Sequence, residues 1–320
     1  MRHWLTTING MLLAAATLVL SSDCILAQCQ IQKLFASDPH GGDRFGTTAD
    51  MSSGYLIVGS PAADCPQGVA CGAAYVFGKT GDSWGQLARL AGQDTGLYDG
   101  FGFSVATDQG TMVVAATSAD DDLQGIDGTG AVYVFSFDGT SWSQTAKLNS
   151  TDGEPGDSFG AGLDVSSGWL VIGAPGDDES GSYSGSVYVF QRIGTSWVQT
   201  QKLLAPYGTQ DDYFGLELAI DGLRMIAAAP WESRAKGTYR GVVYVYEHDG
   251  SVWSLTATIL SPDMYTQGYP FGTAVALDGG RFLADDPRIP GEPNRAHLFD
   301  YSNGNWDHVA SLDTYPAGIV

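Results

Sequence analysis

Apolar residues in this chain come in short runs of roughly four to eight, separated by turns rich in Gly, Asp and Ser. Runs of this length, bounded by such turns, are typical of β-strands rather than helices. In residues 159–190, for example, apolar positions cluster at 163–165, 169–174 and 187–190, and the first two clusters are joined by Ser166-Ser167-Gly168. The pattern predicts an all-β protein.

The pattern repeats five times along the chain. Within each copy the distances from a Phe-Gly pair to a triplet of mostly small residues, and from a later apolar run to a Trp, are constant. Only the loop between these two parts varies in length. A constant spacing indicates paired strands, because one inserted residue would turn every later side chain to the other face of the sheet. The Phe residues are Phe45, Phe101, Phe159, Phe214 and Phe271, and the Trp residues are Trp84, Trp142, Trp197, Trp253 and Trp306.

Each copy therefore contains four short strands, and a four-stranded unit repeated at this spacing is typical of a propeller blade. We predict a five-bladed β-propeller of four-stranded antiparallel blades, formed as a single domain by residues 28–320. The Phe and Trp side chains are expected to pack between blades. We expect a closed ring, in which residues 31–35 or residues 309–312, or both segments together, supply the outer strand of the last blade. A partial propeller completed by a second chain is the alternative.

The repeat resembles the FG-GAP repeats of integrin α subunits and of many secreted bacterial proteins. Phe159-Gly160, Gly173-Ala174-Pro175 and the apolar run 187–190 match that pattern, and the resemblance extends over residues 30–312. Two features differ from integrins: this chain has five copies instead of seven, and its turns between the first two strands are too short for a DxDxDG calcium loop. The resemblance implies a secreted propeller that binds another molecule through its loops.

The N-terminus has the features of a secretory signal peptide. Arg2 precedes an apolar run at 11–20, and a cleavage site follows Ala27, so residues 1–27 are expected to be removed. We predict a secreted or extracytoplasmic protein, in the periplasm or at the cell surface, with no membrane span. In such a compartment Cys65 and Cys71 are expected to form a disulfide, which leaves Cys29 with no assigned partner.

The charge balance restricts the partners. The chain has 36 Asp and Glu residues but 15 Lys and Arg residues, giving a formal net charge of −21. Such a surface repels phosphate backbones and anionic lipids, so we expect no nucleic-acid partner. The acidic surface is consistent either with solubility alone or with binding of divalent cations.

Clusters of carboxylates occur in the variable loops between the second and third strands. Clustered acidic residues beside Gly suit Ca²⁺, which takes six to eight oxygen ligands, although Asp and Gly are also ordinary turn residues. Ca²⁺ is the only cofactor that we predict. The candidate ligands are Asp120, Asp121, Asp122, Asp127, Asp177, Asp178 and Glu179.

Two other groups of polar residues stand out. An acid precedes the repeated Phe by two positions in four copies, as Asp43, Asp99, Asp157 and Asp212, and this recurrence indicates backbone capping. In the fifth copy, Asp285 and Asp286 replace small residues and His297 replaces a Tyr. These substitutions are consistent with relaxed packing in a terminal repeat, or with a site for acid–base chemistry or a cation.

The sequence contains neither a GxSxG nor an HExxH motif. We therefore predict that the protein is not an enzyme and that its loops bind an extracellular protein or a polysaccharide. One alternative is a five-bladed glycosidase that uses Asp285 or Asp286 with a second carboxylate across the channel. Another is a sugar-binding lectin, which would need similar loops in every blade.

Overall fold

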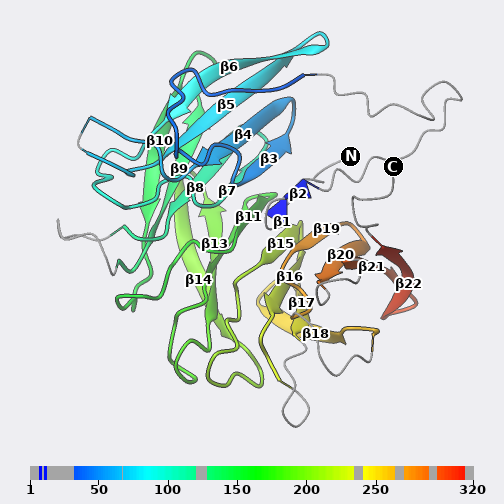
Figure 1. Ribbon diagram of the computed structural model, residues 1–320. Coiled ribbons are helices and arrows are strands. Elements are labelled where there is room, and N and C mark those ends of the chain that lie inside the picture. Colours follow the sequence, from blue (N-terminus) through cyan, green and yellow to red (C-terminus); the bar gives the residue numbers. More distant parts are fainter. Residues whose placement is uncertain are drawn as a thin grey trace, which may run out of the picture.

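The protein folds into five antiparallel sheets of four strands each (Figure 1). The structure is a computed structural model that describes residues 7–8, 11–12, 32–66, 68–119, 128–233, 241–263, 270–287 and 294–313. Within every sheet, each strand pairs with the next strand along the sequence. The predicted fold, five four-stranded blades in a β-propeller, is confirmed. The described residues include no helix that could span a membrane.

The strands of each blade follow the chain from the inside of the propeller outwards. Blade 1 comprises β3 (Ala49–Ser52), β4 (Tyr55–Ser60), β5 (Ala73–Thr80) and β6 (Ser83–Leu90). Blade 2 comprises β7 (Val105–Asp108), β8 (Thr111–Ala116), β9 (Ala131–Phe137) and β10 (Trp142–Leu148). Blade 3 comprises β11 (Leu163–Ser166), β12 (Trp169–Ala174), β13 (Ser186–Ile193) and β14 (Ser196–Leu204). Blade 4 comprises β15 (Leu218–Asp221), β16 (Arg224–Ala229), β17 (Val242–His248) and β18 (Trp253–Leu260). Blade 5 comprises β19 (Val275–Asp278), β20 (Arg281–Asp286), β21 (Arg295–Ser302) and β22 (Asn305–Asp313). A separate short hairpin pairs β1 (Thr7–Ile8) with β2 (Met11–Leu12).

Two-residue turns join the first and second strands of the blades. In blade 3 the turn residues Ser167 and Gly168 both have positive φ, at 53° and 82°. Positive φ at both positions is the geometry that matches the right-handed twist of a tight hairpin. The turn also fixes the register, in which Ser166 lies opposite Trp169.

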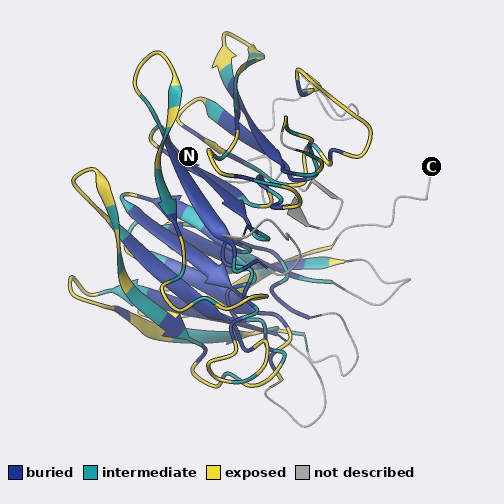
Figure 2. Cartoon of the chain, turned by 90° about the vertical axis from the view of Figure 1, so that its left-hand side faces the viewer, coloured by how far each residue is buried: buried dark blue, intermediate teal, exposed yellow. Residues whose placement is uncertain are grey.

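The core lies between neighbouring blades, where the middle strands are buried almost throughout (Figure 2). Phe159 has no solvent exposure and belongs to a cluster that joins Val113 and Val134 of blade 2 to Tyr188 of blade 3. Phe101, Phe214 and Phe271 are equally buried at the other junctions. The repeated Phe therefore packs between blades, as predicted.

The acid two residues before the Phe binds backbone. The Oδ2 atom of Asp157 accepts a hydrogen bond of 2.8 Å from the backbone N–H of Glu154, three residues earlier. Asp43, Asp99 and Asp212 accept equivalent bonds from His40, Gly96 and Thr209. The predicted capping role is confirmed.

The junction between blade 5 and blade 1 differs from the other four. The first strands of successive blades pack against one another from β3 to β19, but among the described residues β19 and β3 share no comparably extensive contact. A Cβ atom added to Gly46 of blade 1 would meet nothing within 4 Å, whereas one added to the equivalent Gly102 of blade 2 would lie 2.2 Å from the carbonyl oxygen of Ala73. We expected the ring to close between blades 5 and 1. Among the described residues, that junction lacks the close packing seen at the other four.

The two terminal segments take different positions. Strand β22 forms the outer edge of blade 5, which is one of the arrangements that we predicted. Residue 31 lies outside the described residues, and residues 32–35 form no strand. Gln32 instead exchanges two hydrogen bonds of 2.8 Å with the backbone of Trp84 in blade 1. Gln201 of blade 3 bonds Trp253 of blade 4 in the same manner, so the N-terminal segment replaces the outer strand of a preceding blade.

Candidate functional site

The sequence-predicted calcium ligands fall into two groups. Asp120, Asp121, Asp122 and Asp127 lie outside the described residues, so calcium binding in blade 2 stays a prediction. Asp177, Asp178 and Glu179 follow β12 in blade 3, where Asp177 is buried and the other two are exposed.

In blade 1, Cys65 and Cys71 form a disulfide with a Cα–Cα distance of 5.8 Å.

The acids of blade 3 hold a cation that the protein itself supplies. The Lys202 ammonium lies 2.7 Å from carboxylate oxygens of both Asp152 and Asp177 and 2.8 Å from one of Glu179. Asp177 also accepts hydrogen bonds from Ser186 Oγ and Tyr188 OH. Burial alone would raise the pKa of Asp177, but the bond from Lys202 and the other donors hold it below its usual value. Asp177 is therefore held in its ionised form, and it shares the Lys202 ammonium with Asp152 and Glu179.

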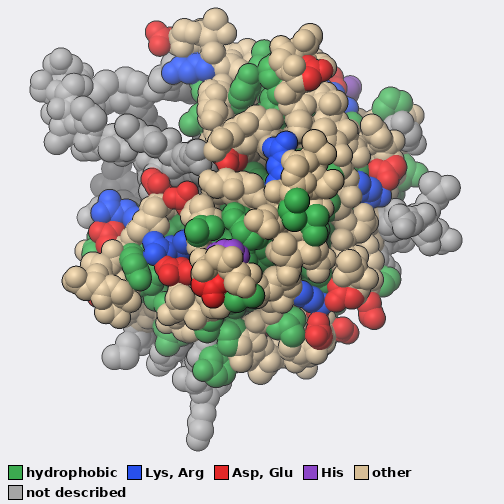
Figure 3. All heavy atoms as spheres, turned by 180° about the vertical axis from the view of Figure 1, so that it is seen from behind, with side chains coloured by type: hydrophobic (Ala, Val, Ile, Leu, Met, Phe, Trp, Pro, Cys, Tyr) green, Lys and Arg blue, Asp and Glu red, His purple; other side chains and the backbone are tan. Residues whose placement is uncertain are grey.

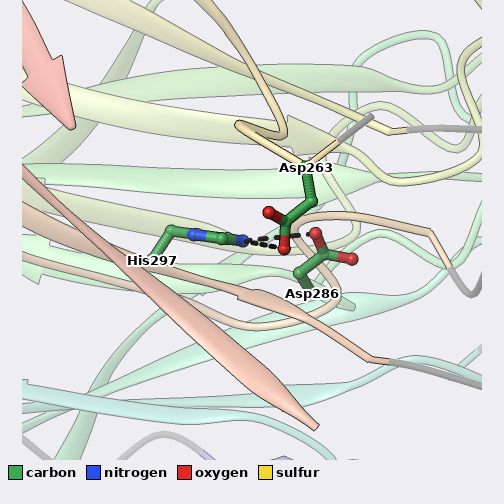
Figure 4. Close-up of side chains that lie close together, drawn as sticks. All are labelled: Asp263, Asp286 and His297. Atoms are coloured by element: carbon green, nitrogen blue, oxygen red, sulfur yellow. Dashed lines mark hydrogen bonds and ion pairs between the residues drawn. The ribbon is translucent and has the colours of Figure 1, made fainter. Parts of the chain in front are cut away.

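Blade 5 brings three potential metal ligands together (Figure 4). Asp286 is the last residue of β20, His297 lies on the adjacent strand β21, and Asp263 lies in the loop that precedes blade 5. His297 Nε2 is 3.2 Å from Asp286 Oδ2 and 3.5 Å from Asp263 Oδ2. The imidazole is fully buried, whereas 14% and 20% of the two Asp side chains are exposed. Ions in solution can therefore reach the carboxylates.

Polar neighbours orient all three side chains. Ser261 Oγ donates a hydrogen bond of 2.6 Å to Asp286, and Arg295 Nη1 donates one of 2.8 Å to Asp263. On the other side of the imidazole, His297 Nδ1 lies 3.1 Å from Ser311 Oγ and 3.2 Å from His308 Nε2. The imidazole is thus held with Nε2 directed at the two carboxylates.

A second pair of acids, Glu217 of blade 4 and Asp285 of blade 5, interact through their charges. Asp285 accepts hydrogen bonds of 2.6 Å from Thr273 Oγ1 and 2.7 Å from the Ala274 N–H. Burial, with a smaller contribution from neighbouring Asp286, raises the pKa of Asp285 to about 6. Glu217 lies just before β15, and its carboxyl group is surrounded by protein although the residue as a whole is partly exposed. Burial, with the charge of Asp285 next in importance, raises the pKa of Glu217 to about 8. At neutral pH this pair offers one protonated and one ionised carboxyl group.

The repeat shows how unusual these carboxyl groups are. At the position of Glu217 the other blades have Thr48, Ser104, Gly162 and Ala274. At the position of Asp285 they have Gly59, Ala115, Gly173 and Ala228. Blade 4 is the one copy with an acid at the first of these positions, and blade 5 is the one copy with an acid at the second.

Sequence reasoning found Asp285, Asp286 and His297 but missed Asp263 and Glu217. Asp263 could have been found from its spacing, since it follows Ile259 by four residues as Asp152 follows Leu148. Glu217 could have been found by aligning the copies on their Phe. Asp285 and Asp286 themselves play different parts, because neighbouring strand residues point to opposite faces of the sheet.

Elsewhere the acidic surface is divided. On the face shown in Figure 3, Asp and Glu side chains form small groups, several of them beside Lys or Arg, instead of one continuous patch. Blade 5 shows the same local pairing, since Arg281 bonds Asp300 through two nitrogen atoms.

Solved structures share this fold. A protein from Lactobacillus plantarum matches with 12% identity and a TM-score of 0.54, over 83% of this chain and 70% of that one. A candidate 6-phosphogluconolactonase from Bacteroides fragilis matches with 12% identity and a TM-score of 0.55, over 84% and 71%. A periplasmic gluconolactonase from Pseudomonas aeruginosa matches with 15% identity and a TM-score of 0.51, over 83% and 72%. At such identities the likeness establishes the fold alone.

These comparisons correct one prediction. We predicted that the protein is not an enzyme, and that prediction is wrong because it treated the fold as a binding scaffold. Two proteins with the same fold are named for lactonase activity, so the architecture gives no ground for excluding catalysis. No curated protein matches this sequence.

The repeat itself matches a family. The FG-GAP repeat model matches residues 29–77, 84–135, 142–190 and 197–246, which together make up more than half of the chain. Each match ends on the third strand of a blade, and the fifth blade lies outside all four. The chain belongs to the FG-GAP repeat family.

Proposed function

We propose that this chain is an extracytoplasmic hydrolase of sugar lactones, with Glu217 and Asp285 as its catalytic residues. The observation that supports the proposal is that two carboxyl groups whose charges interact occupy inner positions where other blades carry small neutral side chains. The lactonase names of two proteins with this fold suggest the substrate class. The predicted signal peptide and the disulfide suggest the compartment.

Lactone hydrolysis needs a base for the attacking water and an acid for the leaving oxygen. Asp285 is the base, since the donors Thr273 Oγ1 and Ala274 N–H favour its ionised form. It takes a proton from water as the oxygen attacks the ester carbon. Glu217, protonated at neutral pH, gives its proton to the ring oxygen as the carbon–oxygen bond breaks. The product is the open-chain acid, and proton exchange with solvent restores both groups.

The charge of the protein favours a neutral lactone over a phosphorylated one. The net charge is −21, and the site itself is acidic. A phosphate group would be repelled both in solution and in the site. We therefore expect glucono-δ-lactone to be hydrolysed faster than its 6-phosphate.

The test is hydrolysis of glucono-δ-lactone by the purified full chain, followed by acid release in a pH-stat and corrected for the spontaneous reaction. Glu217→Gln and Asp285→Asn should each lower kcat/KM by about 10²–10⁴, the usual contribution of general acid–base catalysis. Asp178→Asn, at an exposed acid of blade 3, is the matched control and should leave the rate unchanged.

Two results would overturn the proposal. One is a wild-type rate no higher than the spontaneous rate. The other is full activity in both variants, which would move the chemistry elsewhere. Cleavage of aryl glycosides without lactone hydrolysis would also reject the substrate class, since two carboxyl groups can serve a glycosidase as well.

A further inference from the structure

We propose that Asp263, Asp286 and His297 form a binding site for one divalent transition-metal ion, of which Zn²⁺ is the best representative. The three residues come from a loop and two strands of blade 5, and their ligand atoms all lie within 4.8 Å of one another. A donor set of one imidazole and two carboxylates suits zinc and similar ions, whereas Ca²⁺ prefers oxygen ligands alone. This site is separate from the calcium loops that the sequence predicts.

The distances match the size of such an ion. Zinc lies about 2.0–2.2 Å from nitrogen and oxygen ligands, so two ligands of a tetrahedral site are about 3.4 Å apart. The observed distances from His297 Nε2 to Asp286 and Asp263 are 3.2 and 3.5 Å. The ligand atoms therefore need little movement to enclose an ion.

The surroundings resemble the outer shell of a metal site. Metal-binding imidazoles usually use their second nitrogen for a hydrogen bond, and metal-binding carboxylates accept further bonds. His297 Nδ1 lies beside Ser311 Oγ and His308 Nε2, while Asp286 and Asp263 accept bonds from Ser261 and Arg295. Arg295 bonds the same Oδ2 atom of Asp263 that faces His297, so an ion would share this oxygen or use Oδ1.

The repeat supplies an independent reason to expect a cation here. In blade 3 the positions of Asp263, Asp286 and His297 are occupied by Asp152, Ala174 and Tyr188. Lys202 lies opposite Tyr188 in the register of that blade and places its ammonium on the acids. In blade 5 the residue opposite His297 is Ser311, which carries no charge. Blade 5 has thus gained two metal ligands and lost the ammonium that contacts the blade 3 acids, and, of the three proposed ligands, Arg295 pairs with Asp263.

The site is also distinct from the proposed catalytic pair. Asp286 follows Asp285 directly, but alternate residues of a strand point to opposite faces, so only Asp286 faces His297. The variants that test metal binding therefore leave Glu217 and Asp285 in place.

The experiment is isothermal titration calorimetry of the chelator-treated full chain with ZnCl₂, together with thermal unfolding. One equivalent of Zn²⁺ should bind and raise the melting temperature, because an ion that binds only the folded state stabilises it. CaCl₂ at the same concentration should give no comparable shift. Asp286→Asn should lower the zinc affinity by about 100-fold or more.

A second variant covers the case in which Asp286→Asn does not fold. The double substitution His297→Tyr with Ser311→Lys rebuilds the blade 3 arrangement in blade 5 and should remain folded without the zinc response. Tyr188→Phe in blade 3 is the control and should bind zinc as the wild type does. Absence of zinc binding by the wild type, or equal binding by the double variant, would overturn the proposal.

Discussion

Blades 3 and 5 have the same backbone plan but different polar interiors. In both, a fully buried Phe packs on two rings of the third strand, Tyr188 and Phe190 in one blade and His297 and Phe299 in the other. In blade 3 the acids near the strand ends surround Lys202. In blade 5, Asp263 at the position of Asp152 and Asp286 at the position of Ala174 flank the imidazole of His297, and Arg295 pairs with Asp263. One scaffold therefore tolerates two electrostatic arrangements.

The difference between blades 3 and 5 shows which side chains of a repeat can vary. Apolar side chains between blades are constrained from both sides, so they change little from copy to copy. Polar side chains at the strand ends contact mainly their own loops, so a change such as Tyr to His can be compensated locally. Blade 5, which lies outside the family matches, contains most of these changes.

The largest effect should come from the shared part. Phe159→Ala and Phe271→Ala should each lower the free energy of unfolding by about 3–5 kcal/mol, because each removes a fully buried ring between blades. Phe45→Ala should cost less, about 1–2 kcal/mol, since Phe45 is only half-buried. Urea unfolding measures all three. Equal losses for Phe45 and Phe159 would mean that the junction of blades 5 and 1 is packed like the others.

The next effect concerns blade 3 alone. Lys202→Met removes the ammonium from three carboxylates, of which Asp177 is buried, and should lower the free energy of unfolding by about 2–3 kcal/mol. Lys147→Met in blade 2 is the control, because Lys147 pairs with Asp94, which is half-exposed, and should cost less than about 1 kcal/mol. Similar losses in the two variants would show that the blade 3 acids do not depend on an internal cation.

The sequence predicts the repeated features of the fold better than it predicts the polar clusters that occur in single blades. Several features occur in most copies of the repeat: the four strands, the buried Phe and the capping acid such as Asp157. Each further copy leaves fewer folds that fit the sequence. The blade 5 cluster occurs once in the part of the chain that the structure describes, and it joins Asp263 to His297 across 34 positions of sequence. Its members come together only through strand pairing. Likewise, no spacing in the sequence indicated that Lys202 would reach the predicted calcium ligands.

A smaller effect should distinguish blade 4 from blade 3 at one inner position of the repeat. Glu217 has a folded-state pKa of about 8, above its ordinary value of 4.5, so the folded protein keeps a proton that the unfolded chain releases. The free energy of unfolding should therefore fall as the pH rises from about 4.5 to about 8. Glu217→Gln should remove this dependence and be more stable than the wild type at pH 8, by on the order of 2 kcal/mol.

Urea unfolding at pH 4, 6 and 8 measures this difference. The free energies of unfolding of the wild type and of Glu217→Gln should agree at pH 4, and the difference between them should grow as the pH rises to 8. Blade 3, which has Gly162 at the same position, contributes no such titration. Parallel curves for the two proteins would place the Glu217 carboxyl group in a solvated environment and would weaken its assignment as the proton donor.

The smallest effect should come from the outer shell of the proposed metal site. His308→Ala removes the ring beside His297 Nδ1 but leaves all three proposed ligands, so it should lower zinc affinity by about tenfold with little change in stability. The equivalent residue of blade 3 is Gln199, which lies opposite Phe190 as His308 lies opposite Phe299. Gln199→Ala should therefore leave the calorimetric titration unchanged. A loss of zinc binding as large as that of Asp286→Asn would make His308 a ligand in place of a supporting residue, and an unchanged affinity would mean that Ser311 alone orients the imidazole.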